Sequence, residues 1–353
     1  MTATDKNDDS LPSEWAKQQG VLLAWPHEST DWKAYLNETS LTYESITKEI
    51  AEVEQVFLLC MDAAHATLLK KTLNKSKANL ANITFIESPY NDTWTRDYGP
   101  ITLTGKSQQK TIRKFIDFQF NGWGEKYHAT LDNQASQQLY NRGVFGEESN
   151  TCFESSSIIL EGGGIESDGQ GTLLSTPQCV FARNPKMPKE TLEAEIKKRL
   201  GMQRILWLNH GHLENDDTDG HIDTLARFCS TKSIAYVACN KKDDPLYSGF
   251  QVMQEELESF RTLSNKRYEL FPLPLPVVFN KEKKRLPATY ANFLIMNEKV
   301  LVPLYGDSKA DNEALFILND AFPKHHVVGI DCLSLVHQYG SLHCVTMQIP
   351  TTR

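Results

Sequence analysis

Short apolar runs alternate with amphipathic stretches along the whole chain, and this alternation constrains the fold more than any other feature. Apolar runs of about four to eight residues are typical of strands, and longer stretches with helical spacing are typical of helices. Strands are predicted at 21–25, 55–60, 83–86, 113–120, 172–176, 204–208, 234–239, 293–296, 300–304, 327–330 and 344–349. Helices are predicted at 41–53, 64–73, 189–200, 246–263 and 311–321. The pattern predicts an α/β fold.

The domain organisation follows from what separates these segments. No Pro-rich or Ser-rich linker divides the sequence, and its polar motifs span the whole length. We therefore expect a single catalytic domain over residues 1–353, with residues 1–12 as a flexible N-terminus. The first residues lack an apolar core typical of a secretion signal, and no run approaches the roughly 20 apolar residues of a membrane helix. Seven scattered cysteines suit reduced thiols, so we expect a cytoplasmic protein with no membrane partner.

Polar motifs recur at quasi-regular intervals. Glu161 lies 64 residues after Asp97, His221 lies 60 residues after Glu161, and Cys344 follows after 123, about two such steps. Asn292 lies within that last interval, in a similar setting. Each motif precedes a predicted strand. This recurrence indicates repeated strand-and-helix units around one centre, each contributing one loop to a shared pocket.

Cys344 is the best nucleophile candidate, because it follows a glycine turn at the start of a predicted strand. A small buried hydrophobe is the alternative reading of such a cysteine. His221 is the candidate base, and Asp223 would point to the same side if the segment were extended. An alternative is a metal site made by Asp216, Asp217, Asp219, His221 and Asp223.

Two further acids precede glycine-containing turns. Asp97 follows Arg96 and could present a carboxylate beside Trp94, although a turn aspartate paired with Arg96 is the simpler interpretation. Glu161 precedes three glycines, which allow close backbone approach. Phosphate binding does not suit this loop, since it lacks the P-loop pattern and begins with an acid.

Several of these motifs occur in the order that one protein family shows. They are WTRDYGP at 94–100, LEGGG at 160–164, DGHIDT at 219–224, YANF before VPLYGD, and VVGIDC before LHCVTMQ. The N-terminal SEW and LLAWPH also match. With them, the chain resembles the agmatine deiminase and bacterial peptidylarginine deiminase family of the pentein, or guanidino-group modifying, superfamily. The resemblance runs from about Glu14 to Gln348 and implies a five-bladed α/β propeller with pseudo-five-fold repeats.

The resemblance also implies the catalytic roles. Cys344 would attack the guanidine, and His221 would protonate the leaving ammonia and then activate water. Glu161 would hold His221 protonated, while Asp97 and Asp223 would clamp the guanidinium nitrogens. Neither a metal nor an organic cofactor is implied.

Agmatine is the favoured substrate, giving N-carbamoylputrescine and ammonia in putrescine and polyamine biosynthesis. Trp94 would wall the pocket, and Asp217 matches a family position that faces the distal amine. Peptidylarginine and free arginine remain alternatives. Free arginine would need a partner for its carboxylate, and Arg183 is either that partner or part of a structural ion pair. Residues 338–344 read QYGSLHC where GGGNIHC is common in agmatine deiminases, so Tyr339 and Ser341 depart from the pattern.

Two other classes stay open, an amidinotransferase and a non-catalytic guanidine-binding protein. The net charge of −8, from 37 basic and 45 acidic residues, argues against nucleic acid as a partner. The same charge is compatible with a small cationic guanidine substrate. The sequence leaves homo-oligomerisation open.

Overall fold

Two largely apolar runs form neighbouring parallel strands, β1 (Gln18–Ala24) and β2 (Gln55–Cys60). The structure is a computed structural model, and it describes residues 9–107, 110–146 and 151–351. Such runs suit parallel strands, because both faces of a parallel sheet are usually covered. The two strands pair with Val21 opposite Val56 and Leu23 opposite Leu58. All four side chains are completely buried, so these strands lie in the core.

Within the described residues, five mixed sheets share one pairing pattern. In each, a strand has an antiparallel neighbour on one side and a parallel neighbour on the other. The sheets are β18 (Met347–Pro350), β1, β2 and β3 (Ile83–Glu87); β4 (Ile101–Ser107), β5 (Lys110–Gln119) and β6 (Thr151–Ile159); β7 (Ile165–Ser167), β8 (Thr172–Ser175) and β9 (Arg204–Trp207); β10 (Ala226–Ser230), β11 (Ser233–Ala238) and β12 (Glu269–Pro274); and β15 (Leu294–Ile295), β16 (Lys299–Leu304) and β17 (His326–Asp331). The hairpin of β13 (Val278–Phe279) and β14 (Arg285–Leu286) is separate.

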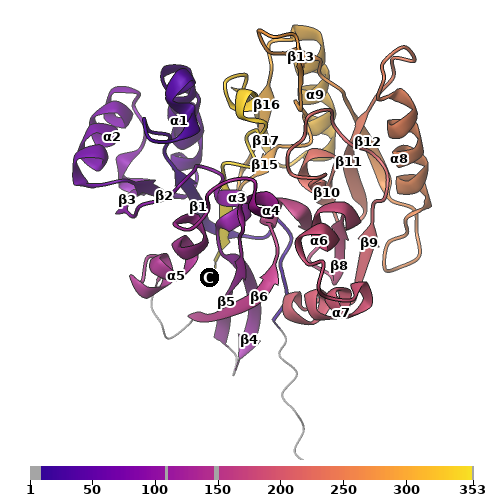
Figure 1. Cartoon of the computed structure of the whole chain (residues 1–353), viewed down its shortest axis with the longest axis horizontal. Coiled ribbons are helices and arrows are strands. Elements are labelled where there is room, and N and C mark those ends of the chain that lie inside the picture. The colour runs from indigo at the N-terminus through magenta and orange to yellow at the C-terminus, as the bar shows by residue number, and fades with distance from the viewer. Residues whose placement is uncertain (1–8, 108–109, 147–150, 352–353) are drawn as a thin grey trace, which may run out of the picture.

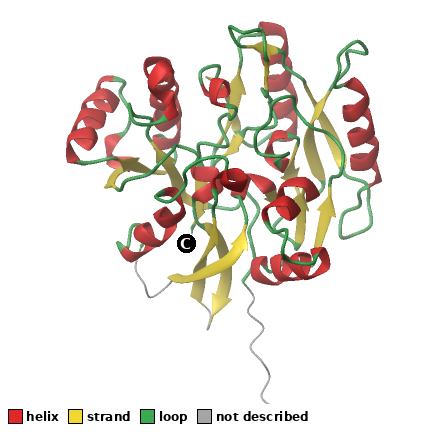
Figure 2. Cartoon of the chain, in the orientation of Figure 1, coloured by secondary structure: helices red, strands yellow, loops and turns green. Residues whose placement is uncertain are grey.

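The longer helices lie toward the periphery of the molecule and most of the sheets lie inside them, while β4, β5 and β6 reach the lower edge of the view (Figures 1 and 2). The α-helices are α1 (Leu36–Ala51), α2 (Ala63–Lys75), α3 (Thr95–Tyr98), α4 (Gly122–Glu125), α5 (Asp132–Asn141), α6 (Pro177–Arg183), α7 (Lys189–Leu200), α8 (Tyr247–Ser259) and α9 (Ser308–Ala321). Short 3-10 helices are η1 (Asp31–Tyr35), η2 (Leu80–Asn82), η4 (Gly162–Gly164), η5 (Ile222–Thr224) and η6 (Leu335–Gln338). The short turns α3 and α4 lie near the middle of the view in Figure 1.

The mixed α/β architecture agrees with the predicted class. The helix predicted at 189–200 coincides with α7, and the other four predicted helices correspond to α1, α2, α8 and α9 with shifted ends. Several strands were not predicted, among them β12 and most of β6. Both are edge strands, where polar residues such as the serines of β6 and the prolines of β12 are tolerated.

The five motif segments each precede the strand that pairs antiparallel at the edge of one sheet. Asp97 lies in α3 before β4, Glu161 precedes η4 and β7, His221 precedes η5 and β10, Asn292 precedes β15, and Cys344 precedes β18. The prediction that Cys344 begins a strand is wrong. Residues 342–345 form a turn, and β18 begins only at Met347, three residues later.

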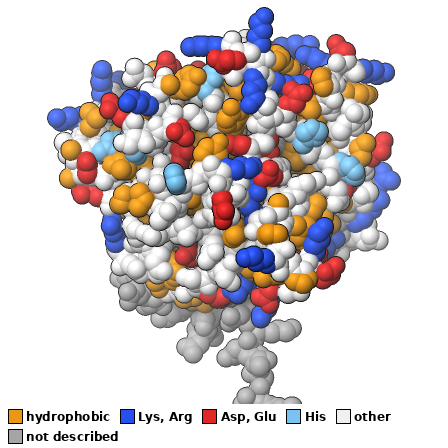
Figure 3. Space-filling model, viewed as in Figure 1, with side chains coloured by type: hydrophobic (Ala, Val, Ile, Leu, Met, Phe, Trp, Pro, Cys, Tyr) orange, Lys and Arg blue, Asp and Glu red, His pale blue; other side chains and the backbone are white. Residues whose placement is uncertain are grey.

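Residues 1–8 of the expected flexible start lie outside the described residues. Ser10 forms a bridge with Thr104, and the Leu11 N–H donates to the Leu200 carbonyl over 2.9 Å. Across the described ranges, every helix is too short or too polar to cross a bilayer. Acidic and basic side chains are interspersed on the face shown in Figure 3.

Candidate active site

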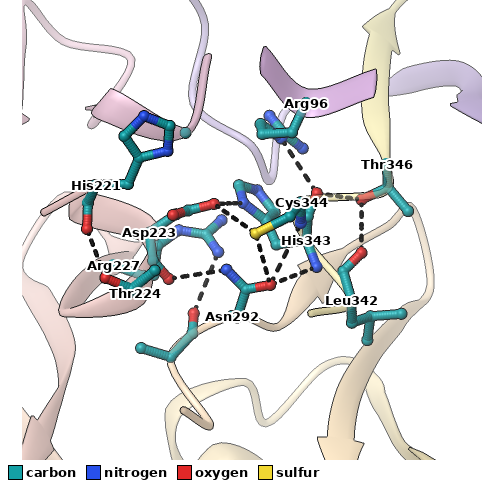
Figure 4. A network of polar contacts seen from close by, with 12 residues as sticks. Arg96, His221, Asp223, Thr224, Arg227, Asn292, Leu342, His343, Cys344 and Thr346 are labelled. Carbon is teal, nitrogen blue, oxygen red and sulfur yellow. Dashed lines mark hydrogen bonds and ion pairs between the residues drawn. The ribbon is translucent and has the colours of Figure 1, made fainter. Parts of the chain in front are cut away.

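The thiol of Cys344 lies between the side chains of Asn292 and Asp223 (Figure 4). Its Sγ is 3.4 Å from Asn292 Oδ1 and 3.8 Å from Asp223 Oδ2. The same Asn292 oxygen accepts the backbone N–H groups of His343, at 2.9 Å, and Cys344, at 3.3 Å. Burial, followed by the charges of Asp223 and Asp97, raises the pKa of Cys344 well above its ordinary value. The sulfur is therefore a thiol until a positive charge arrives beside it.

Asp223 makes its hydrogen bond with a histidine that the sequence did not single out. Its Oδ2 is 2.8 Å from Nδ1 of His343, not from His221. The expectation that Asp223 points to the same side as His221 in an extended segment is wrong, because His221 caps the 3-10 turn η5. Burial opposes ionisation, but the hydrogen bond and charge of His343 lower the pKa of Asp223 below its ordinary value.

His221 instead lies against Glu161 and Asp97. Its Nε2 is 2.7 Å from Glu161 Oε2, and its Nδ1 is 3.6 Å from Asp97 Oδ1. Burial alone would lower the pKa of His221, but the charge of Asp97 and the hydrogen bond and charge of Glu161 raise it well above its ordinary value. The imidazole is completely buried and protonated, so it can donate a proton at Nδ1.

Arg183 holds the other side of Glu161. Its Nε donates to Glu161 Oε1 over 2.7 Å, its Nη1 donates to Asp219 over 2.6 Å, and its Nη2 donates to the Thr218 carbonyl over 2.9 Å. Of the two readings of Arg183, the geometry matches the structural ion pair. Burial raises the pKa of Glu161, but His221 and Arg183 outweigh it and lower that pKa.

Asp97 is held by donors on both oxygens. The Gly163 N–H donates to Oδ1 and the Trp123 indole N–H donates to Oδ2, each over 2.9 Å. Asp97 does not pair with Arg96, which contacts Glu14 instead. Burial raises the pKa of Asp97 to about 6, with His221 opposing and Glu161 reinforcing that rise.

Two buried polar atoms at this site have no hydrogen-bond partner among the described residues. They are Nδ1 of His221 and Oδ1 of Asp223. Unpaired buried groups are costly, so each one in a folded protein asks for an explanation. A ligand that accepts from His221 and donates to Asp223 would satisfy both.

A pocket opens onto Cys344. Among the described residues that line it, all the charged ones are aspartates. It is lined by Asp31, Asp92, Trp94, Asp97, Trp123, Tyr127, Asp217, Thr218, Gln338, Tyr339, Gly340 and Cys344. The predicted substrate-binding residues Trp94, Asp97 and Asp217 all line it, whereas Asp223 is not among the lining residues and lies next to the thiol, with Oδ2 3.8 Å from Sγ. Asp217 accepts from the Tyr127 hydroxyl over 3.0 Å, and Trp94 donates to Asp92 over 3.1 Å.

Several lining residues were not predicted from the sequence. Trp123 lies in the turn α4, where Gly122, Trp123, Gly124 and Glu125 all have positive φ. The string NGWG, with a glycine on each side of the tryptophan, was the available signal. Asp31 and Asp92 had no comparable signal.

The acidic cluster weighed as a metal site is occupied by protein donors. Asp216 accepts from the backbone of Thr218 over 2.9 Å and of Gly220 over 2.8 Å. Asp219 pairs with Lys126 and Arg183. Over the described ranges, no three His, Cys, Asp or Glu side chains are grouped as metal ligands.

Comparison with known families agrees with this geometry. A profile of the Porphyromonas-type peptidyl-arginine deiminase family matches residues 10–350, nearly the whole chain. The chain belongs to this family. The family includes agmatine deiminases: a provisionally named agmatine deiminase of Vibrio parahaemolyticus is 30% identical over 360 residues, covering 96% of each chain. The chain is therefore a guanidino-modifying hydrolase by membership.

Solved structures of family members superpose closely. A provisionally named arginine deiminase of Porphyromonas gingivalis is 41% identical, with a TM-score of 0.89 and coverage of 98% of this chain and 99% of that one. Agmatine deiminase of C. jejuni, as a Cys→Ser variant with substrate bound, is 32% identical, with a TM-score of 0.88 and 99% coverage of both. Dimethylarginine dimethylaminohydrolase shares the pentein fold alone, at 12% identity and a TM-score of 0.50, over 94% of this chain and 100% of that one.

Proposed function

We propose that this family member hydrolyses agmatine to N-carbamoylputrescine and ammonia through a covalent intermediate on Cys344. The observation that carries the proposal is the composition of the pocket. The buried thiol of Cys344 lines it, and among the described residues every charged side chain of the lining is an aspartate. Such a lining suits a substrate that is cationic at both ends. Agmatine has a guanidinium at one end and an ammonium at the other.

The guanidinium would be clamped between Asp97 and Asp223. The free Oδ1 of Asp223 would accept one of its N–H groups, and the orientation would bring the planar carbon in front of Cys344 Sγ. The bound cation would offset the two carboxylates that raise the pKa of Cys344, and thus favour the thiolate. The thiolate would then attack the guanidinium carbon.

The proton transfers would fall to His221. Its protonated Nδ1, free of partners among the described residues, would donate to the departing ammonia as the tetrahedral intermediate collapses. The neutral imidazole would then take a proton from the water that attacks the amidino-thioether. Glu161 would hold the ring throughout by its 2.7 Å contact with Nε2.

The fold supports a shared centre for these residues. We infer that the five sheets with one pairing pattern are the blades of a five-bladed propeller with pseudo-five-fold repeats, and that residues 1–353 form a single catalytic domain. Each blade would contribute the segment before its antiparallel edge strand to the pocket. The five motif segments occupy that place in the five sheets.

Free arginine fits this pocket less well than agmatine. Its carboxylate would face aspartates with no Lys or Arg among the lining residues described. Peptidylarginine is the second candidate, favoured by the family's description and by 38% identity to a solved structure provisionally named a peptidyl-arginine deiminase. A peptide has a neutral amide in place of that carboxylate.

The first prediction is a substrate order. Ammonia release should be measured with agmatine, free arginine and an end-blocked arginine peptide. Agmatine should give equimolar ammonia and N-carbamoylputrescine, with kcat/KM at least about tenfold above arginine, the equivalent of 1.4 kcal/mol. Preference for the peptide would overturn the agmatine assignment and leave the deiminase chemistry. Release of putrescine without ammonia, and only when an amine acceptor is added, would indicate an amidinotransferase, and binding without turnover would indicate a binding protein.

The second prediction concerns Asp217. Asp217→Asn should lower kcat/KM for agmatine by about 10- to 150-fold, the effect of losing one charge-assisted hydrogen bond to the distal ammonium. A simple alkylguanidine without the amine should be nearly unaffected. The matched control is Asp243→Asn, an exposed aspartate outside the pocket lining. An equal loss for both substrates would mean that Asp217 only supports the Tyr127 contact.

A further inference from the structure

A buried line of hydrogen bonds runs from the active site to the N-terminal segment. Asp223 Oδ2 lies 2.8 Å from Nδ1 of His343, and Nε2 of the same ring lies 2.8 Å from Glu14 Oε1. Asp223 and His343 are completely buried, and the Glu14 side chain is 14% exposed. His343 precedes Cys344, so one turn carries both this ring and the candidate nucleophile.

Glu14 is the fixed end of the line. Besides His343, it accepts from Arg96 over 3.2 Å, from Gln348 over 2.9 Å, and from Arg227. Burial opposes ionisation of this carboxyl, but Arg227, His343 and Arg96 lower the pKa of Glu14 well below its ordinary value. Glu14 is therefore an ionised acceptor.

The two contacts of His343 set the number of protons in the line. A hydrogen bond between a ring nitrogen and a carboxylate oxygen needs one proton between them. Because Glu14 is ionised, the proton of its contact lies on Nε2. The contact of Nδ1 with Asp223 needs a second proton, so Glu14, His343 and Asp223 share two protons when the ring of His343 is charged.

We propose that His343 and Glu14 are positioning residues: sharing two protons with Asp223, they hold its Oδ2 and leave Oδ1 directed toward the guanidinium. The inference rests on the proposed function. Asn292 reinforces the arrangement, since its Oδ1 accepts the backbone N–H groups of both His343 and Cys344. Asn292 thus holds the backbone of Cys344 and that of the histidine that contacts Asp223.

The line should be sensitive to pH. The charged groups that face His343 are Glu14 from the N-terminal segment, Asp223 from η5, Arg227 from β10 and Arg96 from α3. Burial, then Arg227 and Arg96, lower the pKa of His343, whereas Glu14 and Asp223 oppose that shift. The doubly protonated ring is present below this pKa and is lost as the pH rises through it. The alkaline limb of kcat/KM, which reports the free enzyme, should therefore include His343.

The third prediction is the effect of Glu14→Gln. Removing a charge that raises the pKa of His343 should move the alkaline limb of kcat/KM to lower pH and reduce kcat/KM at neutral pH by about 10- to 100-fold, the range of one charge-assisted hydrogen bond. The matched control is Glu54→Gln, a similarly buried glutamate that accepts from the Asn297 backbone. Its pH profile should match the wild type. A Glu14→Gln enzyme with lower activity but an unmoved limb, or with full activity, would overturn the proposal.

A measurement on the wild-type enzyme covers the case in which Glu14→Gln does not fold. Ring-nitrogen NMR of 15N-histidine-labelled protein, assigned by the signal lost in His343→Gln, should show both nitrogens of His343 protonated at acidic pH. An Nδ1 that is unprotonated at every pH would refute the positioning line. Its outcome does not depend on turnover: if wild-type enzyme released no ammonia from any guanidine, the proposed function would fail and this measurement would still stand.

Discussion

Replacing Cys344 with alanine is expected to reduce the rate of ammonia release from agmatine by about four orders of magnitude or more, a loss typical of removing a covalent nucleophile. Cys344 is only 5% exposed, and its Sγ contacts the side chains of Asn292 and Asp223 in the reaction site. Agmatine binding should persist, because Asp97 and Asp223 remain. Calorimetric titration and ammonia assays on one preparation would check both expectations.

The matched control is Cys60→Ala, which removes a completely buried thiol in β2. This variant should lose some stability and keep its turnover. Activity of Cys344→Ala within about tenfold of the wild type would contradict the nucleophile assignment, since a covalent mechanism without its nucleophile should lose far more activity than that.

Gly163→Ala should be strongly damaging, although it removes no polar group of the site. A Cβ at Gly163 would lie 2.5 Å from Nδ1 of His221, 2.8 Å from Oδ1 of Asp97 and 3.1 Å from Oδ2 of Asp223. These atoms would have to move by several tenths of an ångström or more, and misplacement by about 1 Å can cost 100-fold in rate. We expect kcat/KM to fall by about 100-fold or more, measured by ammonia release.

Gly249→Ala in α8 is the control for this substitution. No atom lies within 4 Å of a Cβ at Gly249, so activity should be unchanged and stability unchanged or slightly raised. Wild-type activity in Gly163→Ala would show that His221 and Asp97 need not sit where the structure has them. Thermal melts of both variants would separate this effect from loss of folding.

The sequence predicted which segments meet at the pocket because each motif stands before an apolar strand. Cys344, His221, Glu161, Asp97 and Asp223 do lie close together, and their catalytic roles stay predictions. The wrong pairing of Asp223 has a local cause. Alternation of side chains was assumed for an extended segment, whereas residues 222–224 form a 3-10 turn that separates Asp223 from the ring of His221.

The rest of the site depends on contacts that no local pattern encodes. Glu14 and His343 are 329 residues apart in the sequence, and their side chains are in contact because the N-terminal segment packs against the turn that carries Cys344. Trp123 reaches Asp97 from a left-handed turn, which the flanking glycines permit but do not dictate. Arg183 was noticed, but its partners Glu161 and Asp219 come from separate loops.

Peptide mass spectrometry of enzyme quenched in acid during turnover of agmatine is the most direct test of the central claim, that Cys344 attacks the guanidine carbon. We predict a covalent amidino adduct on the peptide that contains Cys344, absent when agmatine is omitted and absent in Cys344→Ala. The six other cysteines serve as internal controls, since five are buried and Cys152 is exposed. An adduct on another cysteine, or rapid ammonia release with Cys344 unmodified at every quench time, would contradict the account.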